Sequence, residues 1–307
     1  MLITVVPAST KTGSAVIRSI LANPPSGATV DIQAVYRKTS KALPEFTSNP
    51  RFTAVQGGID DPASLDLTGS DVVVAVTPPV FESGDMVALT KKRSENVKTA
   101  IEKSGTVKKL VLLSSVGAQF SRGVGEIKTN NMAERVFATT SVPEIIFVRC
   151  AYFMENWTMS LDTLAGPEPF FYSTITPLEW RIPMVAVEDI GHSIAHEALK
   201  QDRSPSKPYV FELYGPRWYT PLDVQVALSD ALGKQVAVKP VAKSELRGFY
   251  EHVFPADIAG EYIEMATSFL EGGVMKPGEV EDGTEVMCGK VELGDAMKQA
   301  VAPLMSA

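Results

Sequence analysis

Residues 7 to 13 (PASTKTG) place hydroxyl-bearing and cationic side chains directly after the first apolar run of the chain. Such groups, with the N–H groups of a following helix, are suited to binding the pyrophosphate of a dinucleotide. The usual loop of this kind is rich in glycine. Here only Gly13 is present, Pro7 lacks an N–H group, and Thr10 adds a side chain near the phosphates. The loop is either repurposed and binds nothing or, as we favour, contacts a dinucleotide through five residues. These are Ser9, Thr10, Lys11, Thr12 and Gly13.

Two adjacent cations, Arg37 and Lys38, follow the second strand-like run, Val30–Tyr36. In a dinucleotide-binding domain this position often carries an acid that binds the ribose hydroxyls of NAD. No acid is present here, and a guanidinium can bind a 2′-phosphate through two parallel hydrogen bonds. The pair therefore favours NADP(H), although a solvated basic turn would have the same sequence.

Later loops supply further candidate contacts to the cofactor. Asp60 follows the third strand-like run, where it could border the adenine, whereas Asp61 could be only the N-cap of a short helix. Thr77 and Pro78 follow the fourth run and would pass beside the phosphates and the nicotinamide ribose.

A proton-donating dyad is missing from the sequence. Short-chain reductases use Tyr-x-x-x-Lys, and none of the eight tyrosines is followed by lysine four positions later. Ser114 and Ser115 end the fifth strand-like run on the cofactor side, where Ser115 could position a substrate or only close the turn. Without the dyad we expect low activity toward plain ketones. Acceptors that spread the incoming charge over their own π-system are less demanding.

The composition excludes several classes of function. A formal net charge of −7 at pH 7 argues against a broad nucleic-acid-binding face. His192 and His196 are four residues apart but have no third ligand nearby, and Cys150 and Cys288 are the only cysteines. We therefore expect neither a metal site nor a disulfide framework. The sequence has no basic signal region and no apolar run approaching the ~20 residues of a membrane span. We expect a cytoplasmic protein.

The elements that must position these residues alternate in the first half of the chain. Helices are predicted over Gly13–Leu21, Met86–Lys103 and Asn130–Thr139, between six strand-like runs. Strict alternation of strands and helices predicts an α/β fold with a doubly wound parallel (Rossmann) sheet. The predicted strands are Leu2–Val6, Val30–Tyr36, Phe52–Val55, Asp71–Val76, Lys109–Ser114 and Glu144–Arg149.

After residue 150 the alternation loosens. We expect residues 1–150 to form an NAD(P)-binding domain and residues 151–307 a smaller, mostly helical, substrate-binding lobe, either separate from the first or interleaved with it. The elements predicted there are a helix over Glu188–Lys200, a strand over Tyr209–Leu213, and helices over Pro221–Leu232, Ser244–Tyr250 and Ile258–Phe269.

Three motifs point to a family: Asn96-Val97, the run KKLVLLSSVGA at 108–118, and VRCAYFMENW at 148–157. Together they resemble the NmrA-like branch of the atypical short-chain dehydrogenases, as found in fungal NAD(P)-binding proteins, over nearly the whole chain. The sequence departs from that family where Pro7 and Thr10 replace glycines. The resemblance implies NADP(H) in the N-terminal lobe and a substrate cleft between the lobes.

The resemblance also suggests candidate catalytic residues. Many NmrA-like enzymes have a lysine at the start of the helix before the sixth strand, and here Asn130 takes its place, with Lys128 two residues earlier. Asn130 can form hydrogen bonds but carries no charge. Lys128 could reach the site or be a solvated loop lysine.

Residues after the sixth strand are candidates for contacting the substrate. Tyr152 and Asn156 could face the cleft, and Tyr152 could protonate a substrate, a role that water could also fill. Phe171 and Trp180 could stack on a flat apolar substrate or only pack the second lobe onto the sheet.

Relatives implied by this resemblance include reductases of quinones, C=C or C=N bonds. We interpret the chain as an NADPH-dependent reductase of a hydrophobic, unsaturated small molecule of the quinone, enone or imine type. A non-catalytic, NADP-binding redox sensor is one alternative. A redox-silent isomerase or cyclase on the same fold is another.

Overall fold

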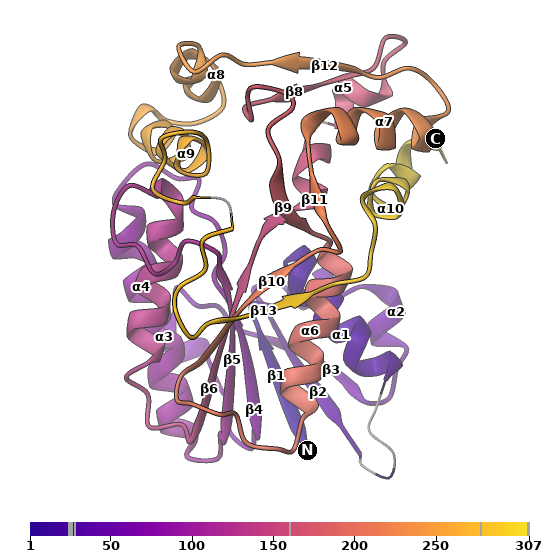
Figure 1. The fold of residues 1–307 in the computed structure, drawn as a ribbon. Coiled ribbons are helices and arrows are strands. Elements are labelled where there is room, and N and C mark those ends of the chain that lie inside the picture. Colours follow the sequence, from indigo (N-terminus) through magenta and orange to yellow (C-terminus); the bar gives the residue numbers. More distant parts are fainter. Residues whose placement is uncertain (24–26, 28, 160, 277, 306–307) are drawn as a thin grey trace.

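A large parallel β-sheet forms the centre of the computed structural model, which describes residues 1–23, 27, 29–159, 161–276 and 278–305 (Figure 1). Its spatial order is β13-β10-β6-β5-β4-β1-β2-β3, and every neighbouring pair is parallel. The eight strands are β1 (Leu2–Val6), β2 (Asp31–Tyr36), β3 (Phe52–Gln56), β4 (Val72–Val76), β5 (Lys109–Ser115), β6 (Glu144–Cys150), β10 (Tyr209–Tyr214) and β13 (Glu285–Cys288).

The first six strands confirm the predicted Rossmann fold, each within one residue of its predicted bounds. Their order, 3-2-1-4-5-6, reverses between β1 and β4. Val5 of β1 pairs with Ala34 of β2 on one side and with Val74 of β4 on the other. The loops after β1 and β4 therefore diverge at the carboxyl edge of the sheet, which is where such folds bind ligands.

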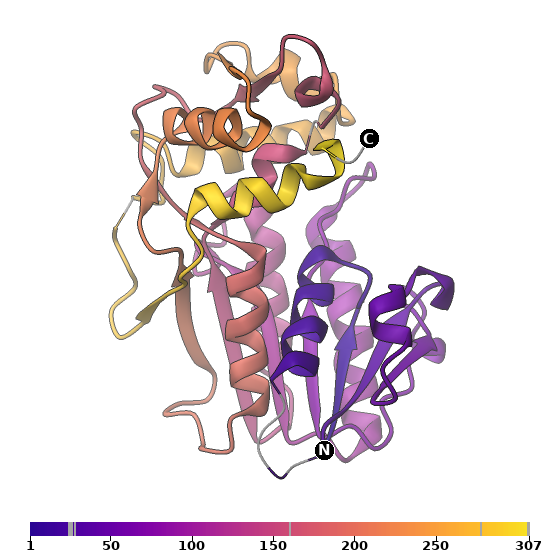
Figure 2. The same ribbon diagram turned by 90° about the vertical axis from the view of Figure 1, so that its right-hand side faces the viewer.

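Helices cover both faces of the sheet, as a doubly wound fold requires (Figures 1 and 2). The helices α1 (Lys11–Ala22) and α6 (Val187–Leu199) lie side by side on one face. The helices α3 (Met86–Ser104) and α4 (Lys128–Phe137) cover the other. These four helices confirm the predicted ones, with small shifts at their ends.

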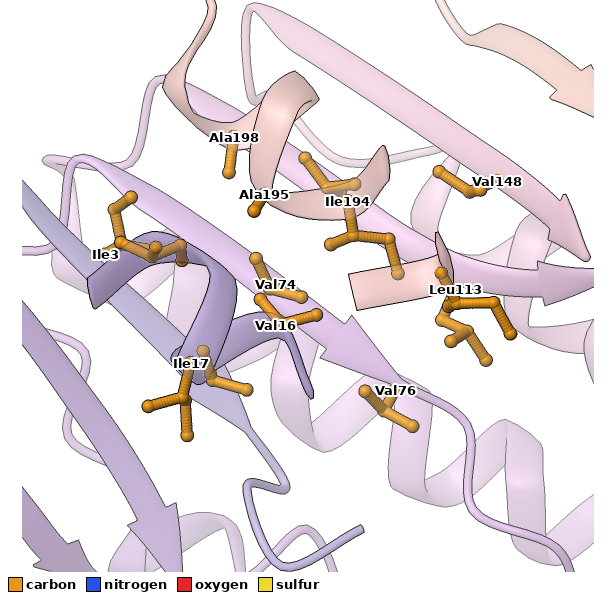
Figure 3. Packing of buried hydrophobic residues seen from close by; sticks show 14 of the residues in the cluster. Ile3, Val16, Ile17, Val74, Val76, Leu113, Val148, Ile194, Ala195 and Ala198 are labelled. Atoms are coloured by element: carbon orange, nitrogen blue, oxygen red, sulfur yellow. The ribbon is translucent and has the colours of Figure 1, made fainter. Parts of the chain in front are cut away.

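Close packing joins α6 to the N-terminal half of the chain (Figure 3). Val16 of α1 and Ile194 of α6 are fully buried against Val74 of the sheet. Each such side chain contributes roughly 1.5–3 kcal/mol on burial. A Cβ added at Gly191 of α6 would lie 2.7 Å from the Ala15 Cβ, so glycine is required for this approach. The helix from the second half is thus part of the first domain's core.

The remaining chain returns to the large sheet twice, as β10 and β13, and otherwise forms a lobe beyond its carboxyl edge (Figure 1). The sequence predicted β10 but neither β13 nor the C-terminal helix α10 (Leu293–Met305). No helix among the described residues is long and apolar enough to cross a membrane. The further elements are α2 (Pro44–Thr47), β7 (Tyr152–Phe153), α5 (Leu161–Ala165), β8 (Phe170–Ser173), β9 (Ile182–Val185), β11 (Trp218–Tyr219), α7 (Pro221–Leu232), β12 (Ala237–Pro240), α8 (Leu246–Glu251), α9 (Ala256–Ser268) and α10 (Leu293–Met305).

Candidate functional site

The turn between β1 and α1 is stabilised by its own polar groups. Thr10 is the N-cap of α1, and its Oγ1 accepts a hydrogen bond of 2.8 Å from the Gly13 N–H. The Ala8 N–H donates to the Val35 carbonyl at 2.9 Å, which ties the turn to β2. Among the described residues, no acceptor is bonded to the N–H groups of Lys11 and Thr12. These two groups remain available for an anion at the helix N-terminus.

Gly13 has a packing role in this turn. A Cβ at this position would lie 2.9 Å from Thr10 Oγ1, 3.0 Å from the Ala8 carbonyl oxygen and 3.1 Å from that of Pro7. Any larger residue would push the helix away from the loop. Of the other predicted contacts, Ser9 and Lys11 are exposed, whereas Thr12 is buried.

Arg37 and Lys38 lie at the carboxyl end of β2 and are both exposed. No described residue forms an ion pair or side-chain hydrogen bond with either of them. The Arg37 stem passes Gly58, where a Cβ would be in ordinary van der Waals contact with Arg37 Cγ, at 3.4 Å. The two unpaired cations fit the 2′-phosphate of a dinucleotide. The open N-terminus of α1 fits its pyrophosphate.

Asp60 has an internal partner, Arg93 of α3, whose Nε lies 2.6 Å from its Oδ1. Asp61 is the N-cap of a short 3₁₀ helix, accepting from the Ala63 N–H at 3.1 Å. An adenine contact from Asp60 would therefore have to coexist with the Arg93 ion pair.

Thr77 and Pro78 lie beside a small cavity of about 20 Å³. Thr90, also on its wall, is buried, and its hydroxyl has no partner among the described residues. The space is about the size needed for one water molecule. A much larger hollow, of about 570 Å³, lies at the opposite edge of the sheet, between the residues that precede β4, β5 and β6.

Ser114 takes part in a buried polar network. Its Oγ donates to Glu134 Oε1 at 2.6 Å, and Arg149 binds both oxygens of the same carboxylate at 3.0 and 2.8 Å. Arg149 also bonds Glu281 at 2.9 Å, in the segment leading to β13. Ser115 donates to the Val116 carbonyl at 3.0 Å, so it closes the turn after β5. Both serine hydroxyls thus donate to internal partners, and their contact with the cofactor stays a prediction.

Lys128 is paired with the lobe. Its Nζ lies 2.7 Å from Glu261 and 3.6 Å from Glu264, both on α9. Burial acts to lower the pKa of Lys128, but the carboxylates of Glu261 and Glu264 together outweigh it, so its pKa is raised and it stays charged. Asn130, two residues further into α4, is buried, and no described residue is hydrogen-bonded to its side chain. Of the two residues, Asn130 has the free hydrogen-bonding capacity.

Tyr152 lies on β7, just beyond the carboxyl end of β6, among other aromatic rings. Its ring centroid is 5.6 Å from that of Trp157 and 6.2 Å from that of Phe269. Burial raises the pKa of Tyr152, with a smaller contribution from Tyr250, so its phenol is neutral at physiological pH. Asn156 is half-buried nearby.

Two other residues expected to contact the substrate have internal roles. Phe171 is buried in the core of the second lobe, with its ring edge-on to Trp157 at 5.6 Å. Trp180 donates from Nε1 to the Phe269 carbonyl at 3.1 Å and packs on the same core. Both side chains therefore contribute to packing within the second lobe, in line with the packing role considered from the sequence. Trp180 remains partly accessible.

The neighbouring Glu155 has a clear local function. Both of its carboxylate oxygens accept from the Val187 N–H, at 2.9 and 3.1 Å, at the start of α6. A negative charge is favourable at a helix N-terminus. Glu155 thus joins the segment after β6 to the helix that packs on α1.

Sequence reasoning missed an aromatic stack in the lobe and a carboxylic acid beside it. Phe81, in the loop after β4, stacks with Phe254 at 5.8 Å, and Phe254 stacks with Tyr262 of α9 at 4.5 Å. Glu126 follows Gly125 in a turn that packs against α9, the helix that carries Tyr262, and it is partly accessible. The spacing of these residues along the chain contains no signal for the stack, since it spans 182 positions. No group of three or more His, Cys, Asp or Glu residues in the described part of the chain could hold a metal ion.

Comparison with a family model identifies the N-terminal domain. Residues 8–146 match the model of the NAD(P)H-binding family, so this part of the chain is an NAD(P)H-binding domain. No curated protein matches the chain in sequence.

Solved structures share the fold over the whole chain. An NADPH-dependent quinone oxidoreductase from Escherichia coli, in complex with NADPH, superposes with a TM-score of 0.71 at 19% identity, over 97% of this chain and 99% of that one. Triphenylmethane reductase from Citrobacter sp., complexed with NADP(H), gives 0.71 at 20% identity, over 98% and 100%. A nucleoside-diphosphate-sugar epimerase from Staphylococcus aureus gives 0.69 at 16% identity, over 97% and 100%. The architecture is thus shared with proteins of different activities.

Proposed function

We propose that this protein is an NADPH-dependent reductase of a hydrophobic, unsaturated small molecule of the quinone, enone or imine type. The observation that carries the proposal is that an NAD(P)H-binding domain and a pair of free cations occur together. An NAD(P)H-binding domain spans residues 8–146, and it presents two unpaired cations where a 2′-phosphate would bind. The likeness to the quinone oxidoreductase and the triphenylmethane reductase supports a reductase among the possible activities.

The cofactor would be held at two points. The N–H groups of Lys11 and Thr12, with the Lys11 ammonium, would bind the pyrophosphate at the start of α1. Arg37 and Lys38 would bind the 2′-phosphate that distinguishes NADPH from NADH. Both sets of donors lie at the carboxyl edge, after β1 and after β2.

The substrate would lie between the carboxyl edge of the sheet and the second lobe. This lobe consists of residues 151–307 without the strands that they contribute to the large sheet. The ring of Tyr152 and the accessible part of Trp180 would contact a flat, apolar acceptor. Stacking on such rings contributes beyond simple burial and fixes orientation.

When bound, the reduced nicotinamide would supply a hydride to an electrophilic carbon of the substrate. The side chains would hold the acceptor in place, exclude water and supply a proton where one is needed. Asn130 would donate a hydrogen bond to the acceptor or to the cofactor ribose. Tyr152, which burial keeps neutral, would remain available as a donor.

The test is single-turnover absorbance at the NADPH band with a naphthoquinone, a cyclic enone and an N-alkyl iminium ion. We expect oxidation of NADPH with at least one of them and slow or no oxidation with a plain aliphatic ketone. Binding is followed separately by nicotinamide fluorescence. Firm NADPH binding with no oxidation by any acceptor would replace the reductase with a redox sensor.

A further inference from the structure

We propose that Glu126 is the acid of this site, donating the proton that an enone or quinone takes up as it is reduced. Tyr262 would donate a second hydrogen bond to the same acceptor oxygen. This inference rests on the proposed reductase function and adds a catalytic residue to it.

The position of Glu126 is set by a close contact between α4 and α9. Glu126 lies in a 3₁₀ turn, Gly125–Ile127, directly before α4 and four residues before Asn130. Gly125 has φ +54, and its N–H donates to Glu264 Oε2 at 2.8 Å. A Cβ at Gly125 would clash with the Glu261 carbonyl, so α9 rests directly on this turn. Figure 1 shows α9 beyond the upper end of α4, where the lobe meets the carboxyl edge of the sheet.

The carboxyl group of Glu126 has little compensation for its burial. Its one side-chain hydrogen bond from a described residue comes from Thr129 Oγ1, at a long 3.4 Å. The nearby cation, Lys128, is paired with Glu261 and Glu264 of α9 and forms no ion pair with Glu126. Burial raises the pKa of Glu126 to about 7, and the Glu261 carboxylate adds to the effect. A large fraction of Glu126 is therefore protonated near neutral pH, the state that a proton donor requires.

Tyr262 supplies the independent observation. Its side chain is buried, and its hydroxyl has no hydrogen-bond partner among the described residues. Glu126 lies in the turn on which α9 rests, because a Cβ at the preceding Gly125 would clash with the backbone of Glu261 and Met265, on either side of Tyr262. Burial raises the pKa of Tyr262, and the Glu126 carboxylate adds to the effect. A buried hydroxyl without a partner costs about 1–3 kcal/mol. An acceptor oxygen between the Glu126 carboxyl and the Tyr262 hydroxyl would give both groups a partner.

The surroundings of this pair connect it to the aromatic residues of the lobe. The ring centroid of Tyr250, on α8, lies 6.1 Å from that of Tyr262. Tyr250 also adds to the effect of burial in raising the pKa of Tyr152. The titratable and polar groups packed around Glu126 are Glu261, Tyr262 and Glu264 of α9, Tyr250 of α8, and Lys128 and Thr129 of α4. Within this cluster, Glu126 has one carboxyl oxygen without a hydrogen bond from any described residue and a pKa of about 7.

The step balances as a two-electron reduction. The reduced nicotinamide would supply the hydrogen and both electrons of one of its C–H bonds, forming a new C–H bond at the β-carbon of the enone, and the C=C π electrons would shift toward the carbonyl oxygen. The O–H bond of Glu126 breaks as a new O–H bond forms on that oxygen, giving an enol that tautomerises to the ketone. Glu126 is left as a carboxylate and takes a proton back from water.

The decisive comparison uses two acceptors with Glu126→Gln. A cyclic enone needs a proton, whereas an N-alkyl iminium ion is already cationic and becomes a neutral amine without one. We expect Glu126→Gln to lower the enone rate by roughly 100-fold or more. The iminium rate and the NADPH affinity should stay within about threefold. Glu126→Asp should recover part of the enone rate.

The pH profile gives a second measurement. With wild-type protein, the enone rate should fall about tenfold per pH unit above pH 7, because the acid is then ionised, while the iminium rate stays flat. Glu251→Gln, which removes an exposed carboxylate of α8 outside this cluster, should leave the rates with both acceptors unchanged. Infrared spectroscopy of the cofactor-free protein should show a protonated-carboxyl band near pH 6 that Glu126→Gln removes.

The outcomes separate the two proposals. Equal loss with both acceptors, or no loss with either, would remove Glu126 from the chemistry while leaving the reductase intact. Absence of the infrared band in wild-type protein at pH 6 would also overturn the assignment. If wild-type protein reduces none of the acceptors, the reductase function fails and this step fails with it.

Discussion

Arg149 and Glu134 face each other through two parallel hydrogen bonds, of 3.0 and 2.8 Å, although their relative exposures are only 5% and 7%. The pair joins β6 to α4, and the remaining nitrogen of Arg149 binds Glu281 from the C-terminal segment. One guanidinium thus links the nucleotide-binding domain, the helix that carries Asn130 and the segment that leads into β13.

Removing this guanidinium should destabilise the protein strongly. Arg149→Leu leaves the buried Glu134 carboxylate without its cation, and breaking such a pair costs about 3–5 kcal/mol. The free energy of unfolding in urea measures the loss. Arg217→Ala is the matched control, because the Arg217–Glu292 pair is 60% and 48% exposed and should contribute under about 1 kcal/mol. Similar losses for the two variants would show that the buried pair has no special role.

Cofactor preference should depend on Arg37. NADPH should bind more tightly than NADH, and Arg37→Ala should lose most of that preference, worth roughly 1.5–3 kcal/mol for a charge-assisted hydrogen bond. Titration of nicotinamide fluorescence with each cofactor measures it. Arg18→Ala, an exposed arginine paired with Glu45, should leave both affinities unchanged. Equal curves for NADPH and NADH with wild-type protein would refute the assignment.

The glycine-poor loop should limit cofactor affinity. Substituting both Pro7→Gly and Thr10→Gly should tighten NADPH binding, because the pyrophosphate can then approach the backbone more closely. The same change removes the Thr10 cap on Gly13 and should lower the free energy of unfolding by up to about 1 kcal/mol. Thr10→Ser keeps the cap and should match wild type in both measurements. Weaker binding by the double variant would show that the loop is optimised around its present residues.

Stability should depend on pH through Glu126. Its pKa is about 7 in the folded protein against an ordinary 4.5, so between these values the folded chain binds more protons than the unfolded chain. Stability is therefore lost as pH rises from about 4.5 to about 7, by up to about 3 kcal/mol. Glu126→Gln should be more stable relative to wild type at pH 8 than at pH 4.5, as measured by urea unfolding. The exposed Glu251→Gln should show no such difference, and an identical pH dependence in Glu126→Gln would contradict the shift.

The sequence determined the sheet and its cofactor edge. Runs such as Leu2–Val6 and Lys109–Ser114 are apolar enough to be predicted as strands from their residues alone. Because these runs alternate with helices, only a few orders of strands in the sheet are possible. Because the carboxyl ends of parallel strands share one edge, Thr10 and Arg37 could be placed near each other without coordinates. These inferences depend on local periodicity and on rules of chain connection, both of which are present in the sequence.

Tertiary structure alone decided what each polar side chain does. Lys128 reads as a solvated loop residue until α9 brings Glu261, 133 positions later, to its ammonium group. Ser114 is predicted from the sequence to contact the cofactor, and only the fold shows that its hydroxyl also donates to Glu134. Glu126 is visible in the sequence, one helical turn before Asn130, yet its raised pKa comes from the burial that α9 imposes. The protonation state and the ion pairs of a side chain depend on desolvation and on partners distant in sequence. The local sequence pattern predicts neither of them.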